Sequence, residues 1–302
     1  MTELPVTHTS TVTDDQIDHL GHMNVRFYGT NAQRATKAVV RGLGLDTAEV
    51  ALTDVYTRHH REQLLGARLA VRSGVIETRP DLLRIYHELV NTDDDSLAAT
   101  FVHGLSRPDG TAFPTEAVEQ ATIIDIPAHG GSRSIDLDAD PMHTAPTLDE
   151  VRARGLEMRE PRRVDGDECD ADGHYIPEFA PMLTWAGVPV GGGPRGDALH
   201  DGPNGEKMGW ASMETRMASP RLPDRGDLIQ SFGALIEMHD KTTHRIQWAF
   251  DLETGDLLTS FETVSLAFDT VGRRAMSIPQ WIRDSEQRTL QADLAPRAGA
   301  QR

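Results

Sequence analysis

The sequence predicts an α+β protein made of two similar halves. The pattern D-x-x-G-H occurs at Asp18–His22 and again at Asp170–His174. Strand-like runs follow both copies in the same order, and a segment with helical periodicity precedes the first series of strands. A helix followed by runs that pair as antiparallel strands is typical of the α+β class, and two ordered copies indicate an internal repeat.

The helix is expected over residues 25–40. Apolar or small residues recur there at intervals of three and four, which places them on one helical face. These positions are Val25, Tyr28, Ala32, Ala35 and Val39. Gly42 and Gly44 follow and supply a stop signal, because glycine readily adopts the left-handed conformation that ends many helices.

The strands of the first half are predicted from alternation of apolar and polar side chains. Residues 69–75 and 83–89 alternate in this way, and a third run covers 97–105 after the turn-forming stretch 91–95. In the second half the corresponding runs are 228–238, 245–250 and 257–268, with a turn at 253–256. Each half therefore predicts a sheet of consecutive antiparallel strands.

Shared residues between the motif and the strands support the repeat. Thr57-Arg58 corresponds to Thr215-Arg216, and Gly66 corresponds to Gly226. The spacing grows in the second copy, which a longer loop containing Gly191-Gly192-Gly193 explains. We predict a first unit over 2–127, a connecting segment over 128–161, a second unit over 162–286 and a flexible tail over 287–302.

Composition excludes several classes of protein. The 302-residue chain has a net charge of −17, which argues against binding to nucleic acid or anionic membranes. The sequence contains no run of 18 apolar residues, so no membrane span is expected. The N-terminus lacks the pattern of a secretion signal. Cys169 is the only cysteine, so no intrachain disulfide can form. We expect a cytoplasmic protein.

The stretch from residue 18 to residue 35 resembles the hotdog-fold acyl-CoA thioesterases of the 4-hydroxybenzoyl-CoA thioesterase type. Gly226-Asp227-Leu228 in the second half resembles the G-D-x-L entry to a strand of that family. The resemblance implies a double hotdog, in which each unit is a long helix wrapped by an antiparallel β-sheet. The residues that match the family's first motif are Asp18, Gly21, His22, Asn24, Tyr28, Arg34 and Ala35.

The resemblance also implies hydrolysis of an acyl thioester carried by coenzyme A or by an acyl-carrier protein. A carboxylate such as Asp18 can deprotonate water or attack the thioester carbon itself. His22 and Asn24 would orient water or the carbonyl, and amides at the helix N-terminus would hold the oxyanion. Gly21 and Tyr28 are the candidate substrate-binding residues of this turn.

Arg58 is a further candidate substrate-binding residue, because its guanidinium group could contact the phosphates of coenzyme A. No H-E-x-x-H or C-x-x-C pattern occurs, so we expect neither a metal nor a cofactor. A homodimer is a further expectation about the assembly.

In the second half, Asp170 and His174 are the corresponding candidate catalytic residues. Ile176 stands opposite Asn24, and Ala180 stands opposite Tyr28. Since isoleucine can neither donate nor accept a hydrogen bond, the two sites should differ, and the site with Asp18 should carry most of the turnover.

Two alternative functions stay open at this point. Hotdog hydratases and dehydratases share the fold but usually carry D-x-N-P-x-H, whose N-P element is missing from residues 18–22. A non-catalytic acyl-binding or assembly module is the second alternative, because the motif of the second half is degraded.

Overall fold

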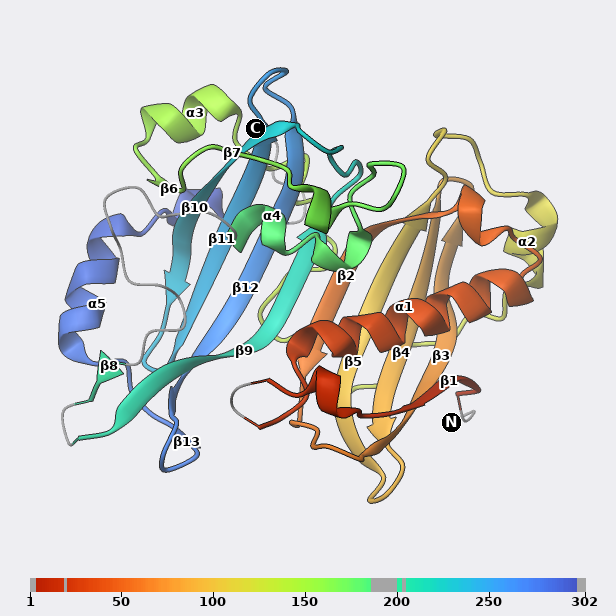
Figure 1. Ribbon diagram of the computed structural model, residues 1–302, viewed down its shortest axis with the longest axis horizontal. Helices are drawn as coiled ribbons and strands as arrows, with labels where there is room; N and C mark the ends of the chain where they lie inside the picture. Colours follow the sequence, from red (N-terminus) through yellow and green to blue (C-terminus); the bar gives the residue numbers. More distant parts are fainter. Residues whose placement is uncertain (1–3, 19–20, 186–199, 203–204, 298–302) are drawn as a thin grey trace. The chain divides into compact units, whose positions relative to one another are not determined.

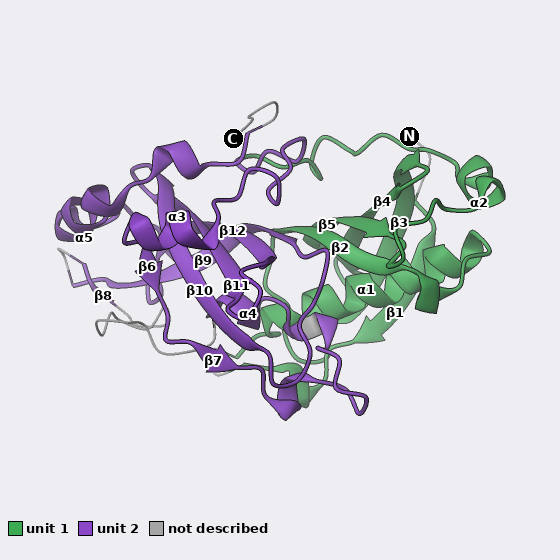
Figure 2. Cartoon of the chain, turned by 90° about the horizontal axis from the view of Figure 1, so that it is seen from above, with its two compact units in different colours: residues 1–133 green, residues 134–302 purple. Residues whose placement is uncertain are grey.

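The chain divides into two compact units, residues 1–133 and residues 134–302 (Figure 2). The structure, a computed structural model, describes residues 4–18, 21–185, 200–202 and 205–297. The predicted glycine-rich loop at residues 191–193 lies outside the described residues. The finer boundaries predicted at residues 127, 161 and 286 stay predictions.

The first unit is a helix packed on one face of an antiparallel sheet (Figure 1). Its strands hydrogen-bond in the order β1-β3-β4-β5-β2, and each neighbouring pair is antiparallel. The α+β class predicted from the sequence is therefore confirmed. The elements are β1 (Val6–Thr11), η1 (Asp14–Gln16), α1 (Val25–Gly42), η2 (Thr47–Glu49), β2 (Ala51–His59), β3 (Arg68–Arg79), β4 (Leu82–Asn91), β5 (Ser96–Ser106) and α2 (Thr115–Gln120).

Both ends of α1 are fixed by local hydrogen bonds. Asn24 caps the N-terminus, where its side chain accepts a hydrogen bond from the amide of Arg26. At the other end, the Leu45 amide donates to the Val40 carbonyl and the Gly44 amide donates to the Arg41 carbonyl. Gly44 has a φ of +73°, so this end is a Schellman motif of the kind that the two glycines predicted.

A layer of polar side chains divides the core beneath α1. One apolar cluster includes Tyr28 and Phe101 and lies under the first half of the helix. A second cluster includes Val40 and Leu105 and lies under the last half. Thr36, between them on the helix, contacts two histidines of the sheet, so the apolar core is interrupted by hydrogen-bonding groups.

The polar layer is a chain of hydrogen bonds through two fully buried imidazoles. Thr36 Oγ1 lies 2.9 Å from His87 Nε2 and 2.7 Å from His103 Nδ1. Ser73 Oγ lies 2.7 Å from His87 Nδ1 and 2.6 Å from Thr7 Oγ1. Burial lowers the pKa of His87 well below its usual value and lowers the pKa of His103 to about 3. Both rings are therefore neutral in the folded protein.

We expect the first unit to lose stability as the solution is acidified. In the unfolded chain these histidines take up protons below pH ~6.5, whereas in the folded chain they stay neutral to much lower pH. The stabilisation is thus complete above pH ~6.5 and falls as pH decreases, by up to ~1.4 kcal/mol per pH unit for each ring. Urea unfolding at a series of pH values between 7.5 and 4.5 measures this slope.

His103→Asn keeps a polar atom near Nδ1 but removes the titrating ring, so its unfolding free energy should depend less on pH. His239→Gln is the matched control, because the His239 side chain is 65% exposed. An unfolding free energy that stays constant between pH 7 and pH 5 would contradict the assignment of neutral buried rings.

The second unit is also an antiparallel sheet, with strand order β9-β12-β11-β10-β6. β13 pairs with β12, β7 pairs with β10, and β8 pairs with β9. Its elements are α3 (Leu148–Ala153), β6 (Glu157–Met158), β7 (Arg162–Arg163), η3 (Gly166–Glu168), η4 (Pro177–Phe179), α4 (Met182–Trp185), β8 (His200–Asp201), β9 (Lys207–Ala218), β10 (Leu228–Met238), β11 (Thr242–Asp251), β12 (Leu257–Asp269), β13 (Arg274–Ala275), α5 (Gln280–Glu286), η5 (Gln287–Thr289) and η6 (Ala292–Leu294).

Apolar side chains cover both faces of this sheet. Trp248 and Phe232 pack with Leu148 and Val151 of α3 on one face. Ile229 packs on the opposite face in a second cluster, which includes Tyr175 and Leu183 from the segment before β8. Leu294, in the segment predicted as a flexible tail, is buried in the first of these clusters.

The segment that follows the second D-x-x-G-H motif differs from α1. Its described part contains only the short turn η4 and the four-residue helix α4, up to residue 185. Pro181 separates η4 from α4, because proline lacks the amide that one continuous helix would require there. Across the described residues, no helix has the length and apolar character that crossing a membrane requires.

Candidate functional site

The first D-x-x-G-H motif forms a closed turn that leads into α1. The Asp18 amide donates to the His22 carbonyl, and the Gly21 amide donates to the Asp18 carbonyl. Gly21 has a φ of +85°, a conformation that favours glycine. The turn therefore brings residues 18 and 22 together.

His22 lies between two carboxylates. Its Nδ1 is 3.3 Å from Asp18 Oδ2, and its Nε2 is 3.4 Å from Glu62 Oε1. The Asp18 and His22 side chains are each 16% exposed, so both are reachable yet partly shielded from water. Either ring nitrogen of His22 therefore faces a carboxylate oxygen, one from the turn and one from Glu62.

Glu62 is a candidate site residue that the sequence analysis missed. It follows the basic stretch 58–61 directly, and an acidic residue at the end of such a stretch is the only local signal. The loop after β2 carries it to the turn, because the Met23 amide donates to the Gln63 carbonyl over 2.7 Å. The site thus draws on two segments that are far apart in the sequence.

Gln63 holds this loop in place. Its side chain is 1% exposed, accepts a hydrogen bond from Asn91 Nδ2 and donates to the Arg61 carbonyl. A buried polar side chain with several partners has little freedom, so its neighbour Glu62 is presented from a fixed backbone.

The Tyr28 side chain is buried beside the turn. Its hydroxyl donates to the Arg61 carbonyl, and its ring packs edge-on against His59 with 5.4 Å between centroids. Burial, reinforced by the negative charges of Glu62 and Asp18, raises the pKa of Tyr28 to about 12. Burial lowers the pKa of His59 to about 4. Both rings are therefore neutral at pH 7.

Asn24 and several amides of the turn have structural partners. The Asn24 side chain caps α1, and the Met23 and Asn24 amides donate to the carbonyls of Gln63 and Gln16. The Gly21 amide is also engaged. The amides of Gly21, Met23 and Asn24 are therefore held by backbone carbonyls, and the oxyanion hole at the helix N-terminus stays a prediction.

Arg58, predicted to contact the phosphates of coenzyme A, is 8% exposed, and strand alternation places it on the opposite face of β2 from His59. Its Nη1 donates to the carbonyls of His129 and Gly131, over 3.1 and 2.9 Å. The phosphate contact stays a prediction, because sequence alternation fixes which residues share a face of a strand but not what covers that face.

The second motif forms a turn with the same backbone hydrogen bonds. The Asp170 amide donates to the His174 carbonyl, and the Tyr175 amide donates to the Pro223 carbonyl. These bonds correspond to Asp18–His22 and Met23–Gln63 in the first unit.

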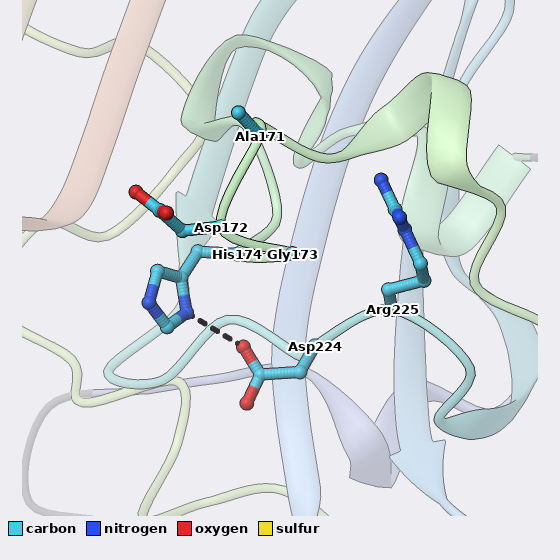
Figure 3. Close-up of a pocket in the computed structure, with 6 residues that line it drawn as sticks. All are labelled: Ala171, Asp172, Gly173, His174, Asp224 and Arg225. Atoms are coloured by element: carbon cyan, nitrogen blue, oxygen red, sulfur yellow. Dashed lines mark hydrogen bonds and ion pairs between the residues drawn. The ribbon is translucent and has the colours of Figure 1, made fainter.

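The side chains of the second turn are arranged differently (Figure 3). His174 Nδ1 pairs with Asp224 Oδ1 at 2.9 Å, and the His174 side chain is 71% exposed. The hydrogen bond to Asp224 raises the pKa of His174. Asp170 Oδ1 accepts hydrogen bonds from the amides of Asp172 and His174, so this carboxylate stabilises the turn. An open cavity of about 350 Å³ is lined by Ala171, Asp172, Gly173, His174, Asp224 and Arg225.

In the second unit, the residues that correspond to Asn24 and Tyr28 have no hydrogen-bonding group in their side chains. Ile176 precedes η4, and Ala180 is buried with no polar side chain to offer. Among the described residues, no three His, Cys, Asp or Glu side chains are grouped as a metal site would require.

Comparison with known proteins finds a family model that matches part of the first unit. Residues 12–109 match the family model of the thioesterase-like superfamily. The first unit is similar to this superfamily over those residues. A search of curated protein sequences finds no match.

Three solved structures share the fold over most of this chain. A Lactobacillus plantarum protein described as an oleoyl thioesterase has a TM-score of 0.60 at 10% identity, over 88% of this chain and 98% of its own. The 12:0-ACP thioesterase from Umbellularia californica gives 0.60 at 10% identity, over 86% and 93%. An acyl-ACP thioesterase from Bacteroides thetaiotaomicron gives 0.56 at 8% identity, over 85% and 96%. The predicted hotdog architecture is confirmed.

We expect Asp170→Ala to destabilise the second unit by ~1 kcal/mol, the usual cost of losing a side-chain acceptor of turn or cap amides. Asp170→Asn keeps the accepting oxygen and should cost much less. The free energy of unfolding in urea distinguishes the two variants. Equal stability of Asp170→Ala and the wild type would show that the two amide contacts do not hold the turn.

Proposed function

We propose that the protein hydrolyses an acyl thioester to a free acid and a thiol at the turn before α1. The Asp18–His22 pair at the start of the long helix of a thioesterase-like domain is the observation that carries this proposal. The names of the three structural relatives, which refer to oleoyl and acyl-ACP thioesterases, agree with it. The carrier is coenzyme A or an acyl-carrier protein.

In the proposed reaction, the Asp18 carboxylate takes a proton from water as the water oxygen bonds to the thioester carbon. Direct attack by Asp18, followed by hydrolysis of the resulting anhydride, is the alternative that the same geometry supports. In both routes the carbon–sulfur bond breaks, and the thiolate leaves and is protonated. His22, 3.3 Å from Asp18, orients the carboxylate and can return a proton to the leaving sulfur.

Glu62 is a positioning residue in this proposal. Its carboxylate oxygen Oε1 lies 3.4 Å from Nε2 of His22, the ring nitrogen that faces away from Asp18. It therefore limits rotation of the imidazole ring, as the third group of a catalytic triad orients its histidine.

The first unit carries most of the turnover in this account. The pair Asp18–His22 is partly shielded, whereas His174 is mainly exposed and pairs with Asp224 instead. The second turn also has Ala180 where the first has Tyr28. The second unit then acts mainly as a structural half. The homodimer and the cytoplasmic location stay predictions.

Replacing Asp18 with Asn should lower kcat by roughly 10² to 10⁴, because the amide can neither take a proton nor attack carbon. Release of thiol from acyl-CoA substrates at saturation measures the effect. Asp15→Asn, at an exposed acid of the neighbouring η1 turn, is the control and should keep wild-type turnover. Asp170→Asn should be much less damaging than Asp18→Asn, and the reverse order would place the main site in the second unit.

Replacing Glu62 with Gln should lower kcat by at least about tenfold, or ~1.4 kcal/mol of barrier, with little change in KM. The amide keeps the size of the side chain but removes the charge that faces His22. Glu116→Gln, at an exposed residue of α2, is the matched control. Full activity in folded Glu62→Gln would remove Glu62 from the site.

A further inference from the structure

Two arginines occupy corresponding places in the two units. Thr57-Arg58 lies near the end of β2, and Thr215-Arg216 lies near the end of β9. Arg58 is 8% exposed and Arg216 is 3% exposed, so both guanidinium groups are removed from water. Buried arginines need several hydrogen-bond acceptors, because the charge is costly to desolvate.

Both arginines find these acceptors in the same segment, which we call the strap (residues 129–139). Arg58 Nη1 donates to the carbonyls of His129 and Gly131 over 3.1 and 2.9 Å. Arg216 Nη1 donates to the carbonyls of Asp136 and Ala139 over 2.8 and 2.9 Å. The guanidinium group suits this use because its donors are held in one rigid plane.

Other contacts hold the first part of the strap on the first unit. His129 Nε2 lies 2.7 Å from Glu88 Oε1, and the Tyr86 hydroxyl donates to the same oxygen. Gly130 passes so close to the Tyr86 ring that a Cβ added there would meet the hydroxyl at 1.9 Å. The backbone is thus packed directly on the side chains of β4.

The last part of the strap has its own contacts on the second unit. The Ser134 amide donates to Glu214 Oε2 over 3.3 Å, and both Ile135 and Ala139 are buried. Arg133, between the two sets of contacts, and Ser134, at the start of the second set, are exposed. The boundary between the two compact units also falls between these residues.

We propose that Arg58 and Arg216 are a matched pair of clasps that fix the strap to each unit separately. The chain between the units is then not one free linker. Its first part belongs to the first unit, its last part belongs to the second unit, and the joint lies at Arg133 and Ser134. The proposal is independent of the thioesterase activity.

Hydrogen–deuterium exchange of the full chain tests the two clasps one at a time. Arg58→Lys should speed exchange of peptides covering 127–132 by about tenfold or more while peptides covering 135–142 keep their wild-type rates. Arg216→Lys should give the opposite pattern. Lysine keeps the positive charge but cannot reach two carbonyls in one plane. Arg68→Lys, at a 69% exposed arginine of β3, should change neither region.

Two adjacent glycines give a second test that leaves both arginines intact. Gly130→Ala should release residues 127–132 in the same way as Arg58→Lys, because the new methyl group collides with Tyr86. Gly131→Ala is the matched control, since a Cβ there meets nothing within 4 Å. These variants decide the question if a lysine variant does not fold.

Two results would overturn the proposal. Unchanged exchange of residues 127–132 in both Arg58→Lys and Gly130→Ala would show that the first clasp does not hold the strap. Faster exchange over the whole of 127–142 in any one variant would show a single continuous strap instead of two independent attachments.

Discussion

A backbone hydrogen bond, from the Met23 amide to the Gln63 carbonyl, joins the two segments of the candidate site. It ties the turn before α1 to the loop after β2 over 2.7 Å. It places the backbone of Glu62 beside the turn, although Glu62 and His22 are distant in sequence. The buried side chain of Gln63 and the cap of Asn24 on α1 hold the two segments on either side of this bond.

The same backbone arrangement recurs in the second unit with different side chains. The Tyr175 amide donates to the Pro223 carbonyl, so the turn and the loop meet there as well. The histidine of this turn pairs with an aspartate of the loop, at the surface. The fold therefore sets where a turn meets a loop, whereas the side chains decide whether that meeting place can do chemistry.

The sequence predicted the features that depend on short spacing. α1 forms where apolar residues recur at helical spacing, and it ends where its glycines predict. Alternation in the strands also placed Ser73 and His87 on one side of their strands. Their role in a polar layer could not be predicted, since it needs Thr36 of the helix to lie across both.

The features that depend on long-range packing could not be predicted. Glu62 reaches the site through the folded loop, and its place after the basic stretch 58–61 does not by itself indicate that role. Arg58 resembles a phosphate-binding residue in the sequence, yet its face of β2 is covered by a segment some seventy residues later. The second turn keeps its aspartate and histidine, but its surroundings decide their partners.

The central claim is that this chain releases a thiol and a free acid from an acyl thioester. The direct measurement follows thiol release with a thiol-reactive dye across acyl-CoAs of different chain length, with mass spectrometry of the acid. The account predicts equal amounts of thiol and free acid from at least one substrate. Hydration or dehydration of an enoyl or hydroxyacyl thioester without thiol release, or binding without any turnover, would contradict it.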